Sequence, residues 1–195
     1  MDFVSPVKSV IPGARGRLLA ALLRLDSGRT VSDVARLAGI SRDRAATVVA
    51  DLERLGLVER RRAGRAWLVT LVEESPVVEA LRQIDDVRER ALVKLRDTAT
   101  TIDPRPAWMA LYGSWVHGTA RADSDLDVAV IAPPGDDRDK FDTALDQWSS
   151  YAERVTGLVA SLVVADSRDD AVGPLWDTIR REGVVLLDDE VNHAR

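Results

Sequence analysis

Two acidic residues in the C-terminal half of the chain have a spacing that suits metal binding. Asp125 and Asp127 lie in the stretch SDLDVAVIA, where apolar residues alternate with them. In a β-strand, alternate side chains share a face and residues two apart are separated by roughly 6.5 Å, so the two carboxylates converge. Like charges at this distance repel each other unless a cation lies between them. The pattern predicts a site for one or two divalent cations, Mg²⁺ or Mn²⁺, although an exposed acidic strand end has the same composition.

A glycine–serine pair lies shortly before these acids. Gly113 and Ser114 follow the apolar run AWMALY, which predicts a buried strand over residues 107–112. Glycine allows the backbone to approach a ligand closely, and Ser114 is placed to cap a following helix and to present its hydroxyl and free N–H groups to phosphate. Such a pair is by itself an ordinary turn. Together with Asp125 and Asp127 it indicates a nucleotide site with a bound metal.

The residues after the acidic pair predict the rest of a small domain. The stretch DRDKFDTALDQWSSYAERVTG has an apolar helix face and ends at Gly157, LVASLVVA predicts a strand, GPLWDTIRREG a helix and VVLL a last short strand. Trp115 is expected mainly in the core, with stacking on a nucleotide base as the alternative. The expected architecture is a small mixed sheet flanked by helices.

The order Gly-Ser, ten residues, Asp-x-Asp resembles the DNA polymerase beta-like nucleotidyltransferase superfamily, and specifically its minimal nucleotidyltransferase members. The resemblance covers residues 106–187. It implies that the glycine–serine pair holds the triphosphate of a nucleoside triphosphate substrate, and that Asp125 and Asp127 bind Mg²⁺. It also implies that Asp125, Asp127 and Ser114 are catalytic, and that the nucleotide is bound by Gly113, Ser114, Gly118 and Ser124.

One position departs from the pattern of that superfamily. Active members commonly carry a third acid on the strand after the long helix, and the corresponding residue here is Ser161. Asp166 lies at the end of that strand, and Asp169 and Asp170 are expected in a loop. The departure puts efficient catalysis in doubt but leaves nucleotide and metal binding in place.

The N-terminal part of the chain has the pattern of three short helices followed by a hairpin. RGRLLAALLRL has leucines at helical spacing, and Thr30 with Asp33 has the form of a capping box for the next helix. Ser41 is placed to cap a third helix whose apolar face is formed by Ala45, Val48, Val49, Leu52 and Leu55. LVERR and RAWLVTL then predict two strands joined by RAGR.

The outward face of the third helix and the hairpin are rich in arginine. A helix with short side chains and arginines near its N-terminus can enter the major groove of DNA, and a basic hairpin can reach phosphates. A solvated hairpin or a protein-binding winged helix is the alternative. The candidate DNA-binding residues are Ser41, Arg42, Arg44, Thr47, Arg60, Arg61, Arg62 and Arg65.

This part of the chain resembles the winged helix-turn-helix domains of bacterial regulators of the MarR and ArsR types. The resemblance spans residues 15–71 and rests on TVSDVARLAGISRDRAATVVADLERLGLVERRRAGR. It implies binding to double-stranded DNA, and the two-fold symmetry of typical operators implies a homodimer.

Composition and charge favour two domains in a chain of 195 residues. Residues 1–75 carry 13 Lys and Arg against 9 Asp and Glu, whereas residues 76–195 carry 14 against 23. The basic part suits DNA and the acidic part suits cations. The expected fold class is α+β, with a winged helix over 1–75, a linker helix over 76–104 and a nucleotidyltransferase domain over 105–195.

The chain has no cysteine, which excludes disulfides and thiolate chemistry. Neither a signal peptide nor an apolar run of membrane-spanning length is found, so we expect a cytoplasmic protein with no membrane partner.

The sequence is compatible with two functions. The first is a DNA-binding enzyme that uses Mg²⁺ to transfer a nucleoside monophosphate from a nucleoside triphosphate, with ATP expected as donor, to a hydroxyl of a protein, an RNA end or a small molecule. The second is a transcription regulator whose degenerate nucleotidyltransferase domain only binds or senses nucleotide. A purely structural interaction module is disfavoured by the Asp125 and Asp127 pair.

Overall fold

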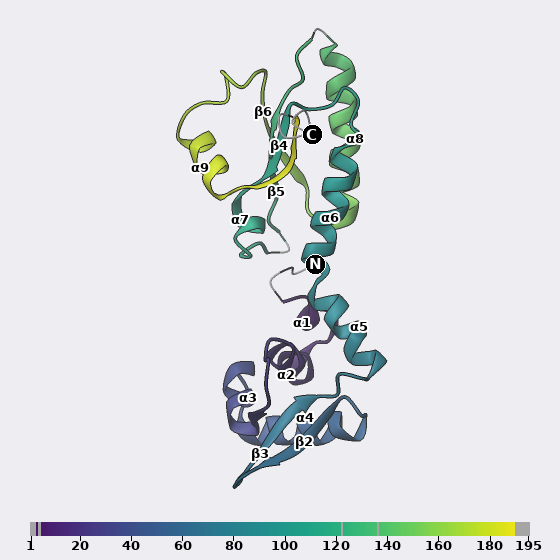
Figure 1. Ribbon diagram of the computed structural model, residues 1–195, viewed down its shortest axis with the longest axis vertical. Helices are drawn as coiled ribbons and strands as arrows, with labels where there is room; N and C mark the ends of the chain where they lie inside the picture. The colour runs from purple at the N-terminus through teal and green to yellow at the C-terminus, as the bar shows by residue number, and fades with distance from the viewer. Residues whose placement is uncertain (1–2, 4, 122, 136, 190–195) are drawn as a thin grey trace. The chain divides into compact units, whose positions relative to one another are not determined.

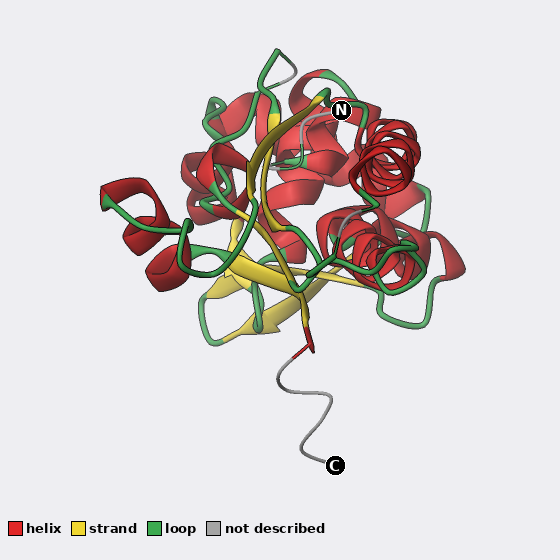
Figure 2. Cartoon of the chain, turned by 90° about the horizontal axis from the view of Figure 1, so that it is seen from above, coloured by secondary structure: helices red, strands yellow, loops and turns green. Residues whose placement is uncertain are grey.

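The computed structural model describes residue 3 and residues 5–121, 123–135 and 137–189. The chain divides into two compact units (Figure 1). The first unit is formed by residues 5–87, and the second by residues 88–189 together with Phe3. Each unit contains both helices and strands, which Figure 2 distinguishes by colour for the chain. The α+β fold class is confirmed.

The first unit is a winged helix. Its elements are α1 (Pro6–Val10), α2 (Gly13–Leu23), β1 (Arg29–Thr30), α3 (Val31–Ala38), α4 (Arg42–Arg54), β2 (Val58–Ala63), β3 (Ala66–Leu71) and α5 (Pro76–Asp85). The strands form a three-stranded antiparallel sheet in the order β1-β3-β2. Neither α1 nor β1 was expected from the sequence, since each is too short to show a periodic pattern.

The predicted caps start two of these helices. The Thr30 side chain accepts a hydrogen bond from the Asp33 N–H (3.2 Å), and its hydroxyl donates to the Asp33 carboxylate (2.7 Å). The Ser41 side chain accepts a hydrogen bond from the Arg44 N–H (3.3 Å) and caps α4. One continuous core lies beneath, with apolar residues from α2, α3, α4, β2, β3 and α5.

The second unit has a four-stranded sheet. Its elements are α6 (Val87–Ala99), β4 (Trp108–Leu111), α7 (Gly113–Val116), β5 (Leu126–Ile131), α8 (Arg138–Thr156), β6 (Ala160–Ala165), α9 (Pro174–Glu182) and β7 (Val184–Asp188). The strand order is β6-β5-β4-β7, with β5 and β6 parallel and the other pairs antiparallel. The predicted mixed sheet is thus confirmed.

Alternating residues of β5 divide between the two faces of this sheet. Leu126, Val128 and Val130 are fully buried, on the face that α6 and α8 flank in Figure 1. Ala129 and Ile131 lie on the other face, in a core with residues of α9. Asp127 belongs to this second face by alternation.

The segment over 76–104 contains two helices where a single linker helix was expected. Helix α5 ends at Asp85 with Asp86 as its C-cap, and α6 begins at Val87. Val78 and Leu81 of α5 belong to the core of the winged helix, whereas α6 is part of the second unit. The segment therefore divides into two helices because its two halves pack in different units. No helix among the described residues has the length and apolar character needed to span a membrane.

Candidate active site and nucleic-acid interface

The backbone at Gly113 lies against the side chain of Asp127. Gly113 has φ +72°, and a Cβ atom built there would lie 2.1 Å from Asp127 Oδ2. The neighbouring Tyr112 N–H donates a hydrogen bond to the Asp127 carbonyl (3.0 Å). The end of β4 and the start of β5 thus bring the predicted glycine and the predicted acid into direct contact, in a space that only glycine leaves open.

The carboxylates of the two predicted acids repel each other. Asp127 is half-buried on β5, and Asp125 is exposed and lies directly before the strand. Burial raises the pKa of Asp127, and the charge of Asp125 raises that pKa further. Two neighbouring carboxylates whose repulsion raises a pKa are a donor set that a divalent cation would stabilise. Asp125 and Asp127 therefore fit the metal that the sequence predicts.

No group of three or more acidic, histidine or cysteine side chains suited to a metal is found among the described residues. The register of the parallel strands pairs Asp127 with Ser161 of β6, so a hydroxyl lies where a third acid would complete the site. Asp166 follows the end of β6 and forms an ion pair with Arg138 of α8. The acid that lies nearest to Ser161 in the sequence after β6 is thus already paired with an arginine.

Ser114 is the second residue of α7, and it does not cap that helix as expected. The N-cap is Tyr112, and no side-chain hydrogen bond caps α7. The helix begins at Gly113, two residues before the start that a Ser114 cap would give. The Ser114 carbonyl accepts hydrogen bonds from the N–H groups of Thr119 (2.9 Å) and Ala120 (3.1 Å), which folds residues 113–118, here called the glycine–serine turn, into a compact loop.

Gly118 and Ser124 shape the loop between the turn and the acids. Gly118 has φ +67°, and its N–H donates to the Trp115 carbonyl (3.2 Å). The Ser124 side chain accepts a hydrogen bond from the Arg121 N–H (2.9 Å), while the Ser124 N–H donates to the Arg121 carbonyl (3.1 Å). In the structure these two predicted nucleotide-binding residues stabilise the local shape of the loop.

Two features near the site were missed or left open by the sequence. Tyr112 is half-buried, and burial together with the charge of Asp127 raises its pKa; its place directly before the glycine–serine pair was the available signal. Trp115 is 1% exposed and packs edge-on against Phe3, with ring centroids 6.0 Å apart. It is therefore a core residue in this structure, and its face is not free for a base.

The candidate DNA-binding surface is formed by α4 and by the β2–β3 hairpin. This hairpin is called the wing below. Ser41, Arg42, Arg44 and Thr47 are all exposed at the start of α4. The Thr47 hydroxyl donates a hydrogen bond to the Asp43 carbonyl (3.1 Å), while neither arginine has an acidic partner among the described residues. These cationic side chains are available to phosphates or base edges.

The four wing arginines differ in their partners. Arg60 forms a two-pronged ion pair with Glu53 of α4, which raises the pKa of Arg60 and lowers that of Glu53. Arg62 donates to the Gly64 carbonyl (3.3 Å), and Arg65 is exposed at the turn.

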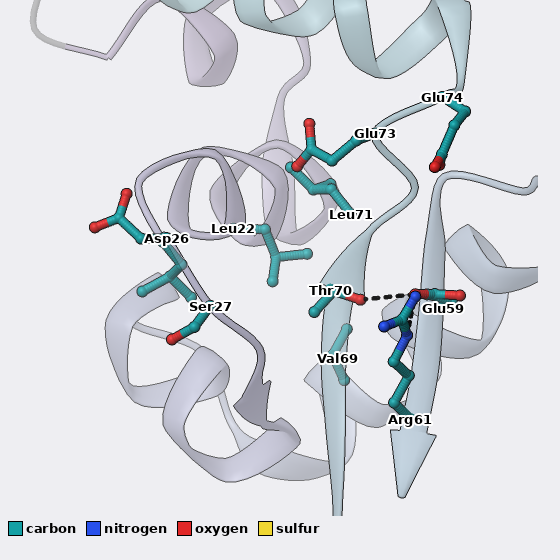
Figure 3. A pocket seen from close by; sticks show the side chains of 11 residues that line it. Leu22, Asp26, Ser27, Glu59, Arg61, Val69, Thr70, Leu71, Glu73 and Glu74 are labelled. Atoms are coloured by element: carbon teal, nitrogen blue, oxygen red, sulfur yellow. Dashed lines mark hydrogen bonds and ion pairs between the residues drawn. The ribbon is translucent and has the colours of Figure 1, made fainter.

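Arg61 lies on the opposite face of β2 and pairs with Glu59 (2.6 Å). Both line a cavity of about 240 Å³ whose other acidic residues are Asp26, Glu73 and Glu74 (Figure 3). Figure 3 also shows the Thr70 hydroxyl directed at Glu59. The acidic surroundings make this face of the wing unsuited to phosphate.

Comparison with known proteins agrees with the division into two units. Residues 11–66 match the family model of the MarR family, and residues 92–181 match that of the nucleotidyltransferase domain. No curated protein matches the chain. A solved structure described as the crystal structure of the toxin-antitoxin with AMP-PNP is 22% identical, with a TM-score of 0.37, and the match covers 53% of this chain and 76% of that chain.

The two matches coincide with the winged helix and with the sheet that carries Asp127, in the order expected from the sequence. The chain therefore joins a MarR-family winged-helix domain, a DNA-binding type of domain, to a nucleotidyltransferase domain.

Proposed function

We propose that this chain is a DNA-binding nucleotidyltransferase that transfers a nucleoside monophosphate from a nucleoside triphosphate, with ATP as the expected donor, to a hydroxyl group. The observation that carries the proposal is the contact between Gly113 and Asp127, which leaves room for backbone and carboxylate but for no further side chain. The repulsion between Asp125 and Asp127 supports it, since bound Mg²⁺ or Mn²⁺ would balance the charge of the two carboxylates and of the triphosphate.

In this reaction the oxygen of the acceptor hydroxyl forms a bond to the α-phosphorus. The bond from that phosphorus to its bridging oxygen breaks, pyrophosphate leaves with the electron pair, and the hydroxyl proton passes to solvent. Gly113 and Ser114 would bind the triphosphate, and Gly118 and Ser124 would fix the loop beside it. A divalent ion held by Asp125 and Asp127 would neutralise charge that develops on the phosphate oxygens.

We propose that the winged helix binds double-stranded DNA through the start of α4 and through the tip of the wing. The exposed and unpaired cations of this surface support the proposal. Ser41, Arg42, Arg44 and Thr47 would meet the major groove, with Arg62 and Arg65 on adjacent phosphates. Arg60 and Arg61 would contribute less, because each is already paired with a glutamate. A homodimer would match the symmetry of a typical operator.

Transfer is tested with α-phosphate-labelled nucleoside triphosphates, Mg²⁺ and cell extract, followed by detection of a labelled acceptor. The label should appear with the wild-type protein and disappear with Asp127→Asn. Asp169→Asn is the matched control, because Asp169 is an exposed carboxylate of the same unit that lies outside the proposed site. Labelling that persists in Asp127→Asn, or that is lost equally in the control, would contradict the proposed role of Asp127.

The second candidate function is that of a transcription regulator that senses nucleotide without transferring it. The observation that favours this function is Ser161, which occupies the place beside Asp127 where a third acid would complete a metal site. Saturable binding of nucleotide with Mg²⁺, without transfer to any acceptor, would support the sensor. Adding back the acid with Ser161→Asp should then increase transfer or create it.

A further inference from the structure

One arginine from a distant part of the sequence lies against the glycine–serine turn. Arg88, in the first turn of α6, donates a hydrogen bond to the Val116 carbonyl, and its guanidinium carbon lies 5.1 Å from the centroid of the Trp115 ring. A Cβ atom at Gly118 would lie 3.7 Å from Arg88 Nη1. A single guanidinium thus contacts the aromatic residue, a carbonyl and the closing glycine of the same turn.

This arrangement includes groups whose burial is unfavourable. Arg88 Nε and Trp115 Nε1 are both buried without a hydrogen-bond partner in the structure. Buried donors without an acceptor cost free energy. The position of Arg88 must therefore be stabilised by other contacts. The contacts with the turn offset the cost through a charged hydrogen bond and a cation–π interaction.

The other side-chain contacts of the turn are exposed to solvent: His117 Nε2 lies 3.5 Å from Glu182 Oε2, and the Thr119 hydroxyl donates a hydrogen bond to the Ser114 carbonyl (3.3 Å). Helix α7 has only four residues, and no side chain caps it. The turn is closed by four backbone hydrogen bonds, in which the N–H groups of His117, Gly118, Thr119 and Ala120 are the donors. Four-residue helices are marginal without tertiary support, so the Arg88 guanidinium and the Phe3 ring that packs on Trp115 supply that support.

We propose that Arg88 is a positioning residue, which holds the glycine–serine turn in the shape that receives the triphosphate. The inference rests on the proposed function for its link to nucleotide, but the effect on the turn itself is independent of that function. Arg88 acts through Trp115 and Val116 and has no direct contact with Asp127 in this proposal. Lysine cannot replace it fully, because an ammonium lacks the planar guanidinium that stacks and donates at once.

The test combines local hydrogen exchange with nucleotide binding in the full-length chain. The variants are Arg88→Ala, Arg88→Gln and Arg88→Lys. Arg96→Ala is the matched control, because Arg96 lies on the same helix and also donates to a backbone carbonyl, that of Val185 (3.2 Å), away from the turn. Exchange is followed at the amides of residues 117–120, and affinity is measured with ATP plus Mg²⁺.

We expect Arg88→Ala to speed exchange at these amides and to weaken ATP affinity, each about tenfold, which corresponds to loss of ~1.4 kcal/mol. Arg88→Lys should fall between wild type and Arg88→Ala, and Arg88→Gln should resemble Arg88→Ala. Arg96→Ala should change neither quantity. Unchanged exchange at residues 117–120 in Arg88→Ala would overturn the proposal, and so would faster exchange spread evenly over the unit in all three variants.

The two proposals fail in different ways. If wild-type protein binds no ATP, the proposed function is wrong, while exchange at residues 117–120 still decides whether Arg88 fixes the turn. If ATP binds normally to Arg88→Ala, the positioning role is wrong and the proposed nucleotide site stands.

Discussion

At Gly113 the backbone conformation and a neighbouring carboxylate both exclude a side chain. The φ of +72° is one that L-residues rarely adopt, and Asp127 Oδ2 lies only 2.1 Å from the position of a Cβ atom. A second glycine, Gly173, also has a positive φ (+102°) but has no atom within 4 Å of its Cβ position. Substitutions at Gly113 and Gly173 can therefore be compared. Both change a backbone with positive φ, but only the one at Gly113 also disturbs the contact with Asp127.

Gly113→Ala should lower the free energy of unfolding by about 1–3 kcal/mol and abolish binding of ATP with Mg²⁺, because Asp127 must move away from the turn. Gly173→Ala should also be destabilising but should leave ATP binding unchanged. Denaturant unfolding and calorimetric titration measure the two effects. Normal ATP affinity in Gly113→Ala would show that the contact with Asp127 is not needed for binding.

The carboxyl of Asp127 should also make metal binding depend on pH. Its pKa is raised, first by burial and then by Asp125, so a proton competes with a cation at a higher pH than for an ordinary aspartate. Mn²⁺ affinity should fall as the pH is lowered through this raised pKa. For the metal-free protein the sign is opposite: the ionised form is the unfavourable one, so stability contributed by this group increases as the pH falls.

Replacing Asp125 should separate the two causes. In Asp125→Asn the repulsion is lost, and the pKa of Asp127 should move down but not return fully to the ordinary value, because burial remains. Carboxyl carbon NMR of the metal-free protein measures the shift directly. A pKa of Asp127 that is the same in Asp125→Asn and wild type would mean that the two acids do not interact.

Neighbouring arginines of the wing have different surroundings because the strand directs them to different faces. Arg60, Arg61 and Arg62 are consecutive on β2, and alternation directs Arg61 to the face that carries the acidic cavity of Figure 3. Arg60 is tied to Glu53, because β2 follows directly after α4 and the hairpin runs back beside it. Only Arg62 and Arg65 stay unpaired among the described wing arginines.

Arg62→Ala and Arg65→Ala should each weaken binding to duplex DNA and reduce the slope of log K against log salt by about 1, as expected for loss of one phosphate contact. Arg61→Ala is the matched control, since it removes the same charge from the same strand, and it should leave the slope nearly unchanged. Binding measured over a salt series by fluorescence anisotropy distinguishes them. An equal loss of slope in all three variants would mean that the wing acts only as a diffuse positive charge.

Local sequence patterns made much of the secondary structure predictable. The caps at Thr30 and Ser41, the stop at Gly157 and the alternation on β5 are all encoded within a few residues, so the sequence suffices to place the elements that contain them. The strand that carries Ser161 was expected from its apolar run, whereas the register that pairs Ser161 with Asp127 was seen only in the structure. The ion pair between Arg60 and Glu53 could not be anticipated, because it depends on how the hairpin packs against α4.

Contacts between segments that are distant in the sequence could not be predicted from it. Phe3 precedes the winged helix in sequence but packs on Trp115 of the nucleotidyltransferase unit. Arg88 reaches Val116, 28 residues further along the chain. Neither contact has a periodic or motif signal, since each depends on the tertiary arrangement of the unit. The boundary between the units likewise became visible only when α5 and α6 were seen to belong to separate cores.

Two separate cores should give the full-length chain two unfolding transitions with separate ligand responses. ATP with Mg²⁺ at 100 times its dissociation constant should stabilise the nucleotidyltransferase unit by about 2.7 kcal/mol and raise only its transition temperature. Operator-like duplex DNA should raise only the transition of the winged helix. Differential scanning calorimetry measures both transitions. The variants Asp127→Asn and Arg62→Ala identify which transition belongs to which unit, because Asp127→Asn should lose only the response to ATP and Arg62→Ala should weaken only the response to DNA. A single transition that both ligands raise to the same extent would show that the units unfold together, and the assignment of separate stabilities to the two cores would then be wrong.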